Sequence, residues 1–195
     1  MIFFSSDTHF HHVNIMDYCP WRRTWAKDVD HMNSVLIAAW NSVVQPTDVV
    51  YHLGDFSFGT DDQIRDIKIA LNGEIKLAIG NHDKTRTRMR TLGFTDVEHF
   101  YQIAYNGITF GMTHDPVRFR PEQLASSNLL LHGHRHGMEH HVGEEGYDKF
   151  SSDSKAKLFD VGVDAVRRTR PCTIDEIRDL FFERQNARLC DSPNS

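Results

Sequence analysis

The sequence has little cysteine and no long hydrophobic run, and each absence narrows what the protein can be. Its three cysteines are an odd number, widely spaced and without a Cys-x-x-Cys pair. We therefore expect a reducing compartment, no disulfide framework and no thiolate metal site. No apolar stretch approaches the roughly 18 residues that a membrane-spanning helix needs. The opening MIFFSSD lacks the charged region of a signal peptide, so a cytoplasmic location is expected.

An excess of positive charge is also missing. The formal net charge of -5 argues against non-specific coating of nucleic acid, although a local basic rim is still compatible with it. Neither an internal repeat nor a linker is evident in the 195 residues. We expect one domain over residues 1–188, followed by a frayed tail at 189–195.

Histidine, in contrast, is abundant and clustered. The chain has 13 histidines, and three of them stand at alternate positions in the segment LLLHGHRHG, residues 129–137. Imidazole is the commonest transition-metal ligand in proteins, so these clusters indicate a metal site.

The first half of the chain alternates between strand and helix patterns. Strands are expected at MIFFSS, DVVYHLGD and EIKLAIGNHD. Residues 30–44 carry apolar side chains at helical spacing, and DDQIRDIKIAL reads as a helix that stops at Asn72-Gly73. This β-α-β-α-β order indicates a mainly parallel sheet covered by helices.

The second half contains more strands. Asn106-Gly107 is a strong hairpin signal between two of them. NLLLHGHRHG and AKLFDVGVDA read as further strands, and TIDEIRDLFFER as a terminal helix. Thr173 and Glu176 are expected to form a capping box at the start of this helix.

Polar clusters follow the apolar strands at five places: SDTH, GD, GNHD, MTHD and HGHRHG. Ligands bind at the carboxyl ends of strands in open α/β sheets, so these clusters are expected to converge on one rim.

The ordered set of clusters is specific, although each motif is weak alone. In chain order they are Asp7-Thr8-His9, Gly54-Asp55, Gly80-Asn81-His82-Asp83, His114 and Gly133-His134-Arg135-His136. This order resembles the calcineurin-like metallophosphoesterase superfamily, whose pattern is DxH, GD, GNH followed by D or E, H, and GHxH. The resemblance extends from residue 1 to about residue 165. FSSDTHFHH, MNSVLIAAWN and VYHLGDF are also similar to small, uncapped bacterial and phage members.

The resemblance implies a fold and a dinuclear site. The fold is an α/β (α+β) four-layer αββα sandwich of two mixed β-sheets, with βαβ units in the N-terminal half and a hairpin-rich C-terminal half. Asp55 is the implied bridge between two metal ions. The remaining ligands divide into two groups, Asp7, His9 and His136 for the first ion and Asn81, His114 and His134 for the second.

These residue types suit the hydrolysis of a phosphate ester. Two ions about 3.5–4 Å apart generate a nucleophile from water and neutralise charge on the phosphate oxygens. A ligand set of nitrogen and oxygen without sulfur suits two divalent ions per chain. Mn²⁺ is the first choice, and Fe, Zn, Co, Ni or Mg are alternatives.

Further residues are predicted to support the site. In the family, the imidazole at the position of His82 acts at the substrate, by donating to a phosphate oxygen or protonating the leaving group. Asn81 and His12 are expected to contact the substrate as well, with an ordinary loop histidine as the alternative for His12. Asp83 is expected to orient neighbouring groups or cap the next helix. His132 is expected to pack under the site, hydrogen-bonded to a ligand or to backbone.

Three other features leave two interpretations open. The basic stretch at residues 84–90 is either a contact for a polyanion or a solvated surface, and its four cations cannot share one helix face. Arg22 and Arg23, beside two tryptophans, form either a lip for a nucleotide or part of the core and surface. Phe10 and Phe56 are either pocket walls or core residues.

We expect a phosphodiesterase acting on a small or nucleotide-type phosphoester, with in-line attack by a metal-bound hydroxide. GDFSFGT and GNHD depart from the GDxxDRG and GNHE of protein Ser/Thr phosphatases. The chain is also too short for a cap domain, so an open site favours a diester. A phosphomonoesterase, a nuclease and a non-catalytic metal-binding scaffold are the alternatives. Nucleic acid is not favoured as a partner, and neither a membrane nor an obligate protein partner is indicated.

Overall fold

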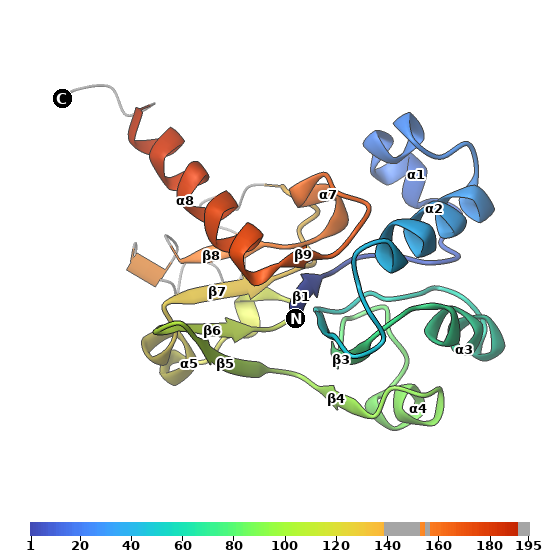
Figure 1. Ribbon diagram of the computed structural model, residues 1–195, viewed down its shortest axis with the longest axis horizontal. Helices are drawn as coiled ribbons and strands as arrows, with labels where there is room; N and C mark the ends of the chain where they lie inside the picture. Colours follow the sequence, from blue (N-terminus) through green and yellow to red (C-terminus); the bar gives the residue numbers. More distant parts are fainter. Residues whose placement is uncertain (139–152, 155–156, 191–195) are drawn as a thin grey trace.

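The computed structural model describes residues 1–138, 153–154 and 157–190, and two mixed β-sheets form its centre (Figure 1). The larger sheet has the strand order β4-β3-β2-β1-β9. Four of its strands run parallel: β1 (Ile2–Ser5), β2 (Val49–His52), β3 (Glu74–Ala78) and β4 (Asp96–Glu98). The short β9 (Cys172–Thr173) pairs antiparallel with β1. The parallel sheet predicted for the first half is thus confirmed.

The smaller sheet has the order β5-β6-β7-β8. Strands β5 (Tyr101–Tyr105) and β6 (Ile108–Met112) form the predicted hairpin, in which Asn106 and Gly107 have φ values of 48° and 79°. Two successive positive φ angles match the twist of the flanking strands. However, β7 (Leu129–His132) runs parallel to β6, and β8 (Leu158–Asp160) runs parallel to β7.

The expectation of a hairpin-rich C-terminal half is therefore wrong for this sheet. The chain between β6 and β7 contains a 3-10 turn, η2 (Pro116–Arg118), and a helix, α5 (Pro121–Ser126). Such a crossover returns the chain to the starting edge, so the next strand pairs in parallel.

Alternate side chains of the strands enter different hydrophobic layers. Phe3 and Val50 face a cluster with the helices of the first half, whereas Phe4 and Tyr51 face a cluster shared with the smaller sheet. On the far face of the smaller sheet, Leu130 packs in a third cluster together with residues of η2 and α5. Three layers of packed side chains separate four layers of structure, which is the αββα sandwich.

Helices α2 (Val29–Asn41), α3 (Asp61–Ala70) and α4 (Arg86–Thr91) lie on the side of the larger sheet, whereas α5 and α8 (Ile174–Cys190) lie on the side of the smaller one (Figure 1). The expected helix at 30–44 is α2, which buries the predicted Met32, Leu36 and Trp40. Glu176 and Thr173 form the predicted capping box at the start of α8, with bonds of 2.9 and 3.2 Å.

Three short elements border the site: α1 (Ile15–Tyr18), η1 (Pro20–Thr24) and α7 (Val163–Val166). Of the tail predicted to fray, α8 includes residues up to Cys190, and residues 191–195 lie outside the described part of the chain. Across the described ranges, no helix is both long and apolar enough to cross a bilayer.

Candidate metal centre

The five polar clusters converge at the carboxyl ends of strands from both sheets. The loops after β1, β2 and β3 carry Asp7, Asp55 and His82, and the loops after β6 and β7 carry His114 and His134. Each loop leaves a strand whose last two residues are buried, one on each face of the sheet, which fixes where the loop begins. The sequence prediction that these clusters share one rim is confirmed by their contacts.

The first group of side chains is Asp7, His9 and His136. Nε2 of His9 and Nε2 of His136 are 3.3 Å apart, and each lies 3.8 Å from Oδ1 of Asp7. Asp7 and His9 are almost completely buried. Two imidazole nitrogens that face each other beside a buried carboxylate form a pocket of electron-pair donors for a cation.

The second group comprises Asp55, His114 and His134, with Asn81 beside them. Nε2 of His114 lies 3.4 Å from Oδ2 of Asp55 and 2.9 Å from Oδ1 of Asn81. Nδ1 of His134 lies 3.0 Å from the same Asn81 oxygen. The structure thus separates the predicted ligands into the same two sets as the resemblance did.

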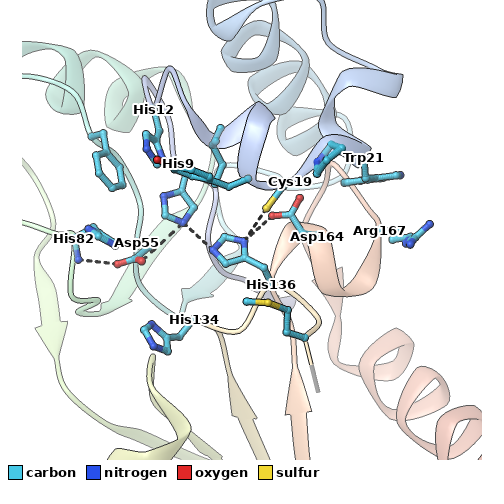
Figure 2. A pocket seen from close by; sticks show the side chains of 15 residues that line it. His9, His12, Cys19, Trp21, Asp55, His82, His134, His136, Asp164 and Arg167 are labelled. Atoms are coloured by element: carbon cyan, nitrogen blue, oxygen red, sulfur yellow. Dashed lines mark hydrogen bonds and ion pairs between the residues drawn. The ribbon is translucent and has the colours of Figure 1, made fainter. Parts of the chain in front are cut away.

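Asp55 stands between the two groups. Its Oδ2 lies 3.8 Å from Nε2 of His9 in the first group and 3.4 Å from Nε2 of His114 in the second. Its Oδ1 accepts the backbone N–H of His82 at 2.9 Å (Figure 2). One oxygen is therefore held by the loop after β3, and the other faces both groups.

The backbone at these positions is strained. Five non-glycine residues with positive φ fall in the clusters, and a sixth, His11, lies two residues beyond the first cluster; the five are Asp7, His9, Asp55, His134 and His136. This conformation is costly for L-amino acids and tends to gather at functional sites. With positive φ angles, neighbouring side chains can point into the same small volume, whereas neighbouring side chains of an extended strand point to opposite faces.

Two glycines allow the loops to come close enough. Gly54 has φ +92°, and a Cβ there would lie 2.6 Å from Nδ1 of His114. At Gly133 a Cβ would lie 2.4 Å from Oδ2 of Asp7. The positive φ angles of this segment fall on the histidines that follow Gly133, His134 and His136. The backbone N–H of His134 donates to Oδ2 of Asp7 at 3.0 Å, and this bond holds the start of the turn against the first group.

Asp83 lies beneath Asp55. Its carboxylate accepts the backbone N–H groups of Asp55, Phe56 and Gly80 at 3.0, 2.9 and 2.8 Å. The N-cap of α4 is Thr85, so of the two roles considered for Asp83, orientation of its neighbours is the one that its contacts match.

Asp164 at the start of α7 is a site residue that sequence reasoning missed. Its carboxylate contacts Nδ1 of His136 at 2.8 Å (Figure 2). It also accepts a hydrogen bond from Nη2 of Arg22 at 2.8 Å. A donor hydrogen on Nδ1 leaves Nε2 of His136 free to bind a metal. The only sequence signal was an aspartate following the apolar strand of KLFDVGVD.

Arg22 is completely buried and is not part of a nucleotide lip. It donates to the carbonyls of Asp7 and Thr8 at 2.6 and 2.9 Å, in addition to Asp164. It therefore ties the DTH loop to α7. Arg23 lies at the surface and pairs with Asp17.

Cys19 was not expected near a metal, yet its Sγ lies 3.5 Å from Nδ1 of His136. Together with Asp164 these atoms are close enough to surround an ion. The Arg22 guanidinium already binds the Asp164 carboxylate, and its charge would repel a second cation. We therefore interpret this group as hydrogen-bonded support for His136.

Electrostatics favour cations at both groups. Burial raises the pKa of Asp7 to about 7, against the opposing pull of His114 and His136. Burial also acts to raise the pKa of Asp55, but the contact with His114 outweighs burial and holds that pKa below its usual range.

The pKa values of His114 and His136 are raised by their carboxylate neighbours. Burial lowers the pKa of both, but the Asp55 and Asp7 carboxylates raise that of His114 to about 9. The hydrogen bond to Asp164 raises that of His136 to about 11. The raised pKa values mean that Asp7, His114 and His136 hold protons that a divalent cation would replace, so the residues present fit such ions.

A cavity of about 710 Å³ opens over the first group. His82 and His12 line it, as the prediction of substrate contact requires. Phe58 stacks on His12 with a centroid distance of 3.8 Å and lies 4.7 Å from the ring of His82. Phe10 and Phe56 are instead fully buried against each other, so of the two interpretations the core one holds.

The other residues left open by the sequence have structural partners. His132 is buried, and its Nδ1 contacts the carbonyl of Gly133 at 2.8 Å. In the basic stretch, Arg86 and Arg90 pair with Glu98, and Arg88 pairs with Asp61. None of these three arginines lines the cavity, so the surface interpretation holds.

A second cavity of about 690 Å³ lies on the other side of the site. It is lined by Asn81, His114 and His134 of the second group, and farther out by Arg118 and Arg120. Nothing in the sequence around these two arginines distinguished them from other surface residues.

Comparison with known proteins identified no matching family model. The chain is 34% identical over 182 residues to an uncharacterized protein, MJ1445, of Methanocaldococcus jannaschii, and the match covers 92% of this chain and 90% of that protein. It is 28% identical to the Gene 66 protein of Mycobacterium phage L5, with 91% and 92% coverage.

A solved structure shares the fold. The protein of unknown function AQ665 from Aquifex aeolicus superimposes with a TM-score of 0.68 at 26% identity. The match covers 92% of this chain and 98% of that one. The shared fold therefore extends along nearly the whole of both chains.

Proposed function

We propose that the chain, which belongs to one family with MJ1445 and whose ordered motifs resemble those of the calcineurin-like metallophosphoesterase superfamily, is a metal-dependent phosphoesterase. The observation that carries the proposal is the position of Asp55. Its Oδ2 faces Nε2 of His9 at 3.8 Å and Nε2 of His114 at 3.4 Å, so one carboxylate serves two groups of donors. A shared carboxylate is what a pair of closely spaced cations needs.

The ligand sets follow from the two groups. Asp7, His9 and His136 would hold one divalent ion, Asn81, His114 and His134 the other, and Asp55 both. When bound, such ions supply a nucleophile derived from water at neutral pH and positive charge beside the phosphate oxygens. Donors of nitrogen and oxygen favour Mn²⁺, with Fe, Zn, Co, Ni or Mg as alternatives.

His82 is the proposed catalytic residue of the chain itself. Its backbone is fixed by the bond to Asp55, while its exposed side chain lines the cavity of about 710 Å³. From there the imidazole is placed to donate to a phosphate oxygen or to protonate the departing oxygen. Asp83 supports this arrangement, because it orders the backbone of both the Asp55 and the Gly80 loops.

We propose a phosphodiester of small or nucleotide type as the substrate. Cavities lie on both sides of the candidate metal centre, so a phosphorus bound there has room for a substituent in each direction. A monoester would fill only one of them.

Hydrolysis of bis-p-nitrophenyl phosphate and of p-nitrophenyl phosphate in the presence of Mn²⁺ tests this proposal. We expect the diester to have the higher kcat/KM. Turnover of the monoester alone would make the protein a phosphomonoesterase. Absence of turnover of both esters with every divalent ion named above would favour the non-catalytic scaffold.

A further inference from the structure

The two cavities flank the candidate metal centre and share one wall. His134 lines both, while Asp55 and His136 line the first and Asn81 and His114 line the second. A phosphodiester held between the two groups of donors would therefore direct one of its alcohols into each cavity. The two cavities have nearly equal volumes, about 710 and 690 Å³, but their chemistry differs.

The first cavity is aromatic and apolar beyond the metal-binding side chains. Tyr18, Trp21 and Phe58 line it, together with Ile15 and Met138. Tyr18 is 70% exposed and Phe58 37% exposed, so both offer surface to a ligand. Trp21 lies on the far side of His136 from Asp55, and Arg167 lies beyond it at the outer end (Figure 2). Such a wall suits a flat aromatic group, and a base stacks on aromatic side chains whatever its identity.

The second cavity is polar and cationic. Arg118 and Arg120 line it beyond Asn81, with Gln123 beside them. The side chain of Arg118 is 76% exposed and pairs with Asp115 at 3.4 Å. Among the described residues no carboxylate pairs with Arg120. Two guanidinium groups against one carboxylate leave a net positive wall, and guanidinium binds phosphate in a bidentate manner.

We propose that the substrate is a short phosphorylated oligonucleotide of about two nucleosides. One base occupies the aromatic cavity, and a second phosphate, one nucleoside away from the reacting one, binds Arg118 and Arg120. This proposal rests on the proposed phosphoesterase function and adds the chemistry of both substituents. The formal net charge of -5 fits a short anion held by local cations better than a long polyanion.

Two esters with the same leaving group test the aromatic cavity. The p-nitrophenyl ester of thymidine monophosphate and methyl p-nitrophenyl phosphate differ only in the nucleoside. With Mn²⁺ we expect kcat/KM to be about tenfold higher for the thymidine ester. Trp21→Ala and, separately, the exposed Tyr18→Ala should reduce this ratio toward one. Phe182→Ala removes an aromatic ring that is 52% exposed on α8 and should leave the ratio unchanged. A ratio that survives both cavity variants would overturn the aromatic assignment.

Thymidine dinucleotides test the cationic cavity. They carry a terminal phosphate at one end, at the other end or at neither. One of the two phosphorylated forms should have a KM about tenfold lower than the unphosphorylated form. The double variant R118A/R120A should remove that gain. Arg65→Ala is the matched control, because Arg65 also pairs with an aspartate three residues away, but on α3. A gain that persists in the double variant would overturn the assignment of the second phosphate.

Failure of this inference differs from failure of the proposed function. If the wild-type protein hydrolyses methyl or bis-p-nitrophenyl phosphate but gains nothing from a nucleoside or a second phosphate, only the substrate inference is wrong. If it hydrolyses none of the esters with any of the divalent ions, the phosphoesterase function itself is wrong.

Discussion

At the scale of the residue, His82 combines a fixed backbone with an exposed ring. Its N–H donates to Asp55 at 2.9 Å, and the ring lies 6.1 Å from that of His9 and 4.7 Å from that of Phe58. The ring lines the first cavity and belongs to neither group of donors. The side chain is therefore expected to act on substrate and not to hold metal.

Replacement of His82 by alanine tests whether this side chain acts on substrate without holding metal. The variant should lose at least about a hundredfold in turnover of bis-p-nitrophenyl phosphate, because a proton donor is lost. Its metal content should stay near two ions per chain, measured by elemental analysis. His31→Ala on α2 is the control, a histidine that lines neither cavity. Wild-type activity in the His82 variant would exclude the proposed role.

Asp164 acts through another residue. Because it binds both Nδ1 of His136 and the buried Arg22, it fixes the tautomer that presents Nε2 to a cation. The pKa of Asp164 is held below its usual range by His136 and Arg22 despite burial, so the group is a stable acceptor.

Asp164→Asn should weaken metal binding about tenfold to a hundredfold, seen as a higher metal concentration for half-maximal activity. Activity at saturating metal should fall much less, which distinguishes a positioning role from a catalytic one. Asp62→Asn, at a side chain that is 88% exposed, is the control. Unchanged metal dependence in folded Asp164→Asn protein would contradict this role.

Residues within the motifs could be placed from the sequence, whereas Asp164, Arg22 and Phe58 could not. Arg22 meets Asp164 across 142 positions, and nothing local in either segment signals the pair. Likewise, Phe58 rather than Phe56 faces the cavity because Phe10 and Phe56 pack on each other. Which residues pair, and which phenylalanine faces the cavity, is therefore decided by packing between segments that are far apart in the sequence.

At the scale of the element, α8 is attached to the larger sheet at its first turn. Glu176 binds Arg170 and Arg168, each at 2.6 Å, as well as the backbone of Thr173. Its hydrogen bond with Arg170 is the main reason that its pKa falls to about 2. The capping box was predictable from Thr173 and Glu176, but the two arginines were not, because they reach it from the preceding loop.

A lowered pKa in the folded state means that Glu176 stabilises the protein above its ordinary value of 4.5. That contribution is lost as the pH falls from there to about 2. Glu176→Gln should lower the free energy of unfolding by about 1 kcal/mol at neutral pH after allowance for solvent screening, and the difference should vanish near pH 2. Urea unfolding of chelator-treated protein measures it, with the exposed Glu183→Gln as control. An effect that persists unchanged at low pH would show that charge is not the cause.

At the scale of the whole molecule, the two sheets bring ligands from distant parts of the chain together. The first group joins Asp7 and His9 to His136, and the cavities extend to either side of the sheet ends. The alternation of apolar residues predicted the larger sheet and its helices. It did not predict that β6, β7 and β8 are parallel, because apolar strands look alike in either direction and the crossover elements η2 and α5 have only 3 and 6 residues.

The central claim is that two divalent ions act together at Asp55. The most direct test is to strip the protein with a chelator and add back Mn²⁺ while following hydrolysis of bis-p-nitrophenyl phosphate. We expect no activity in the stripped protein and a rise that reaches its plateau at two equivalents of Mn²⁺ per chain, with Asp55→Asn inactive throughout. Full activity without metal, or saturation at a single equivalent, would contradict it.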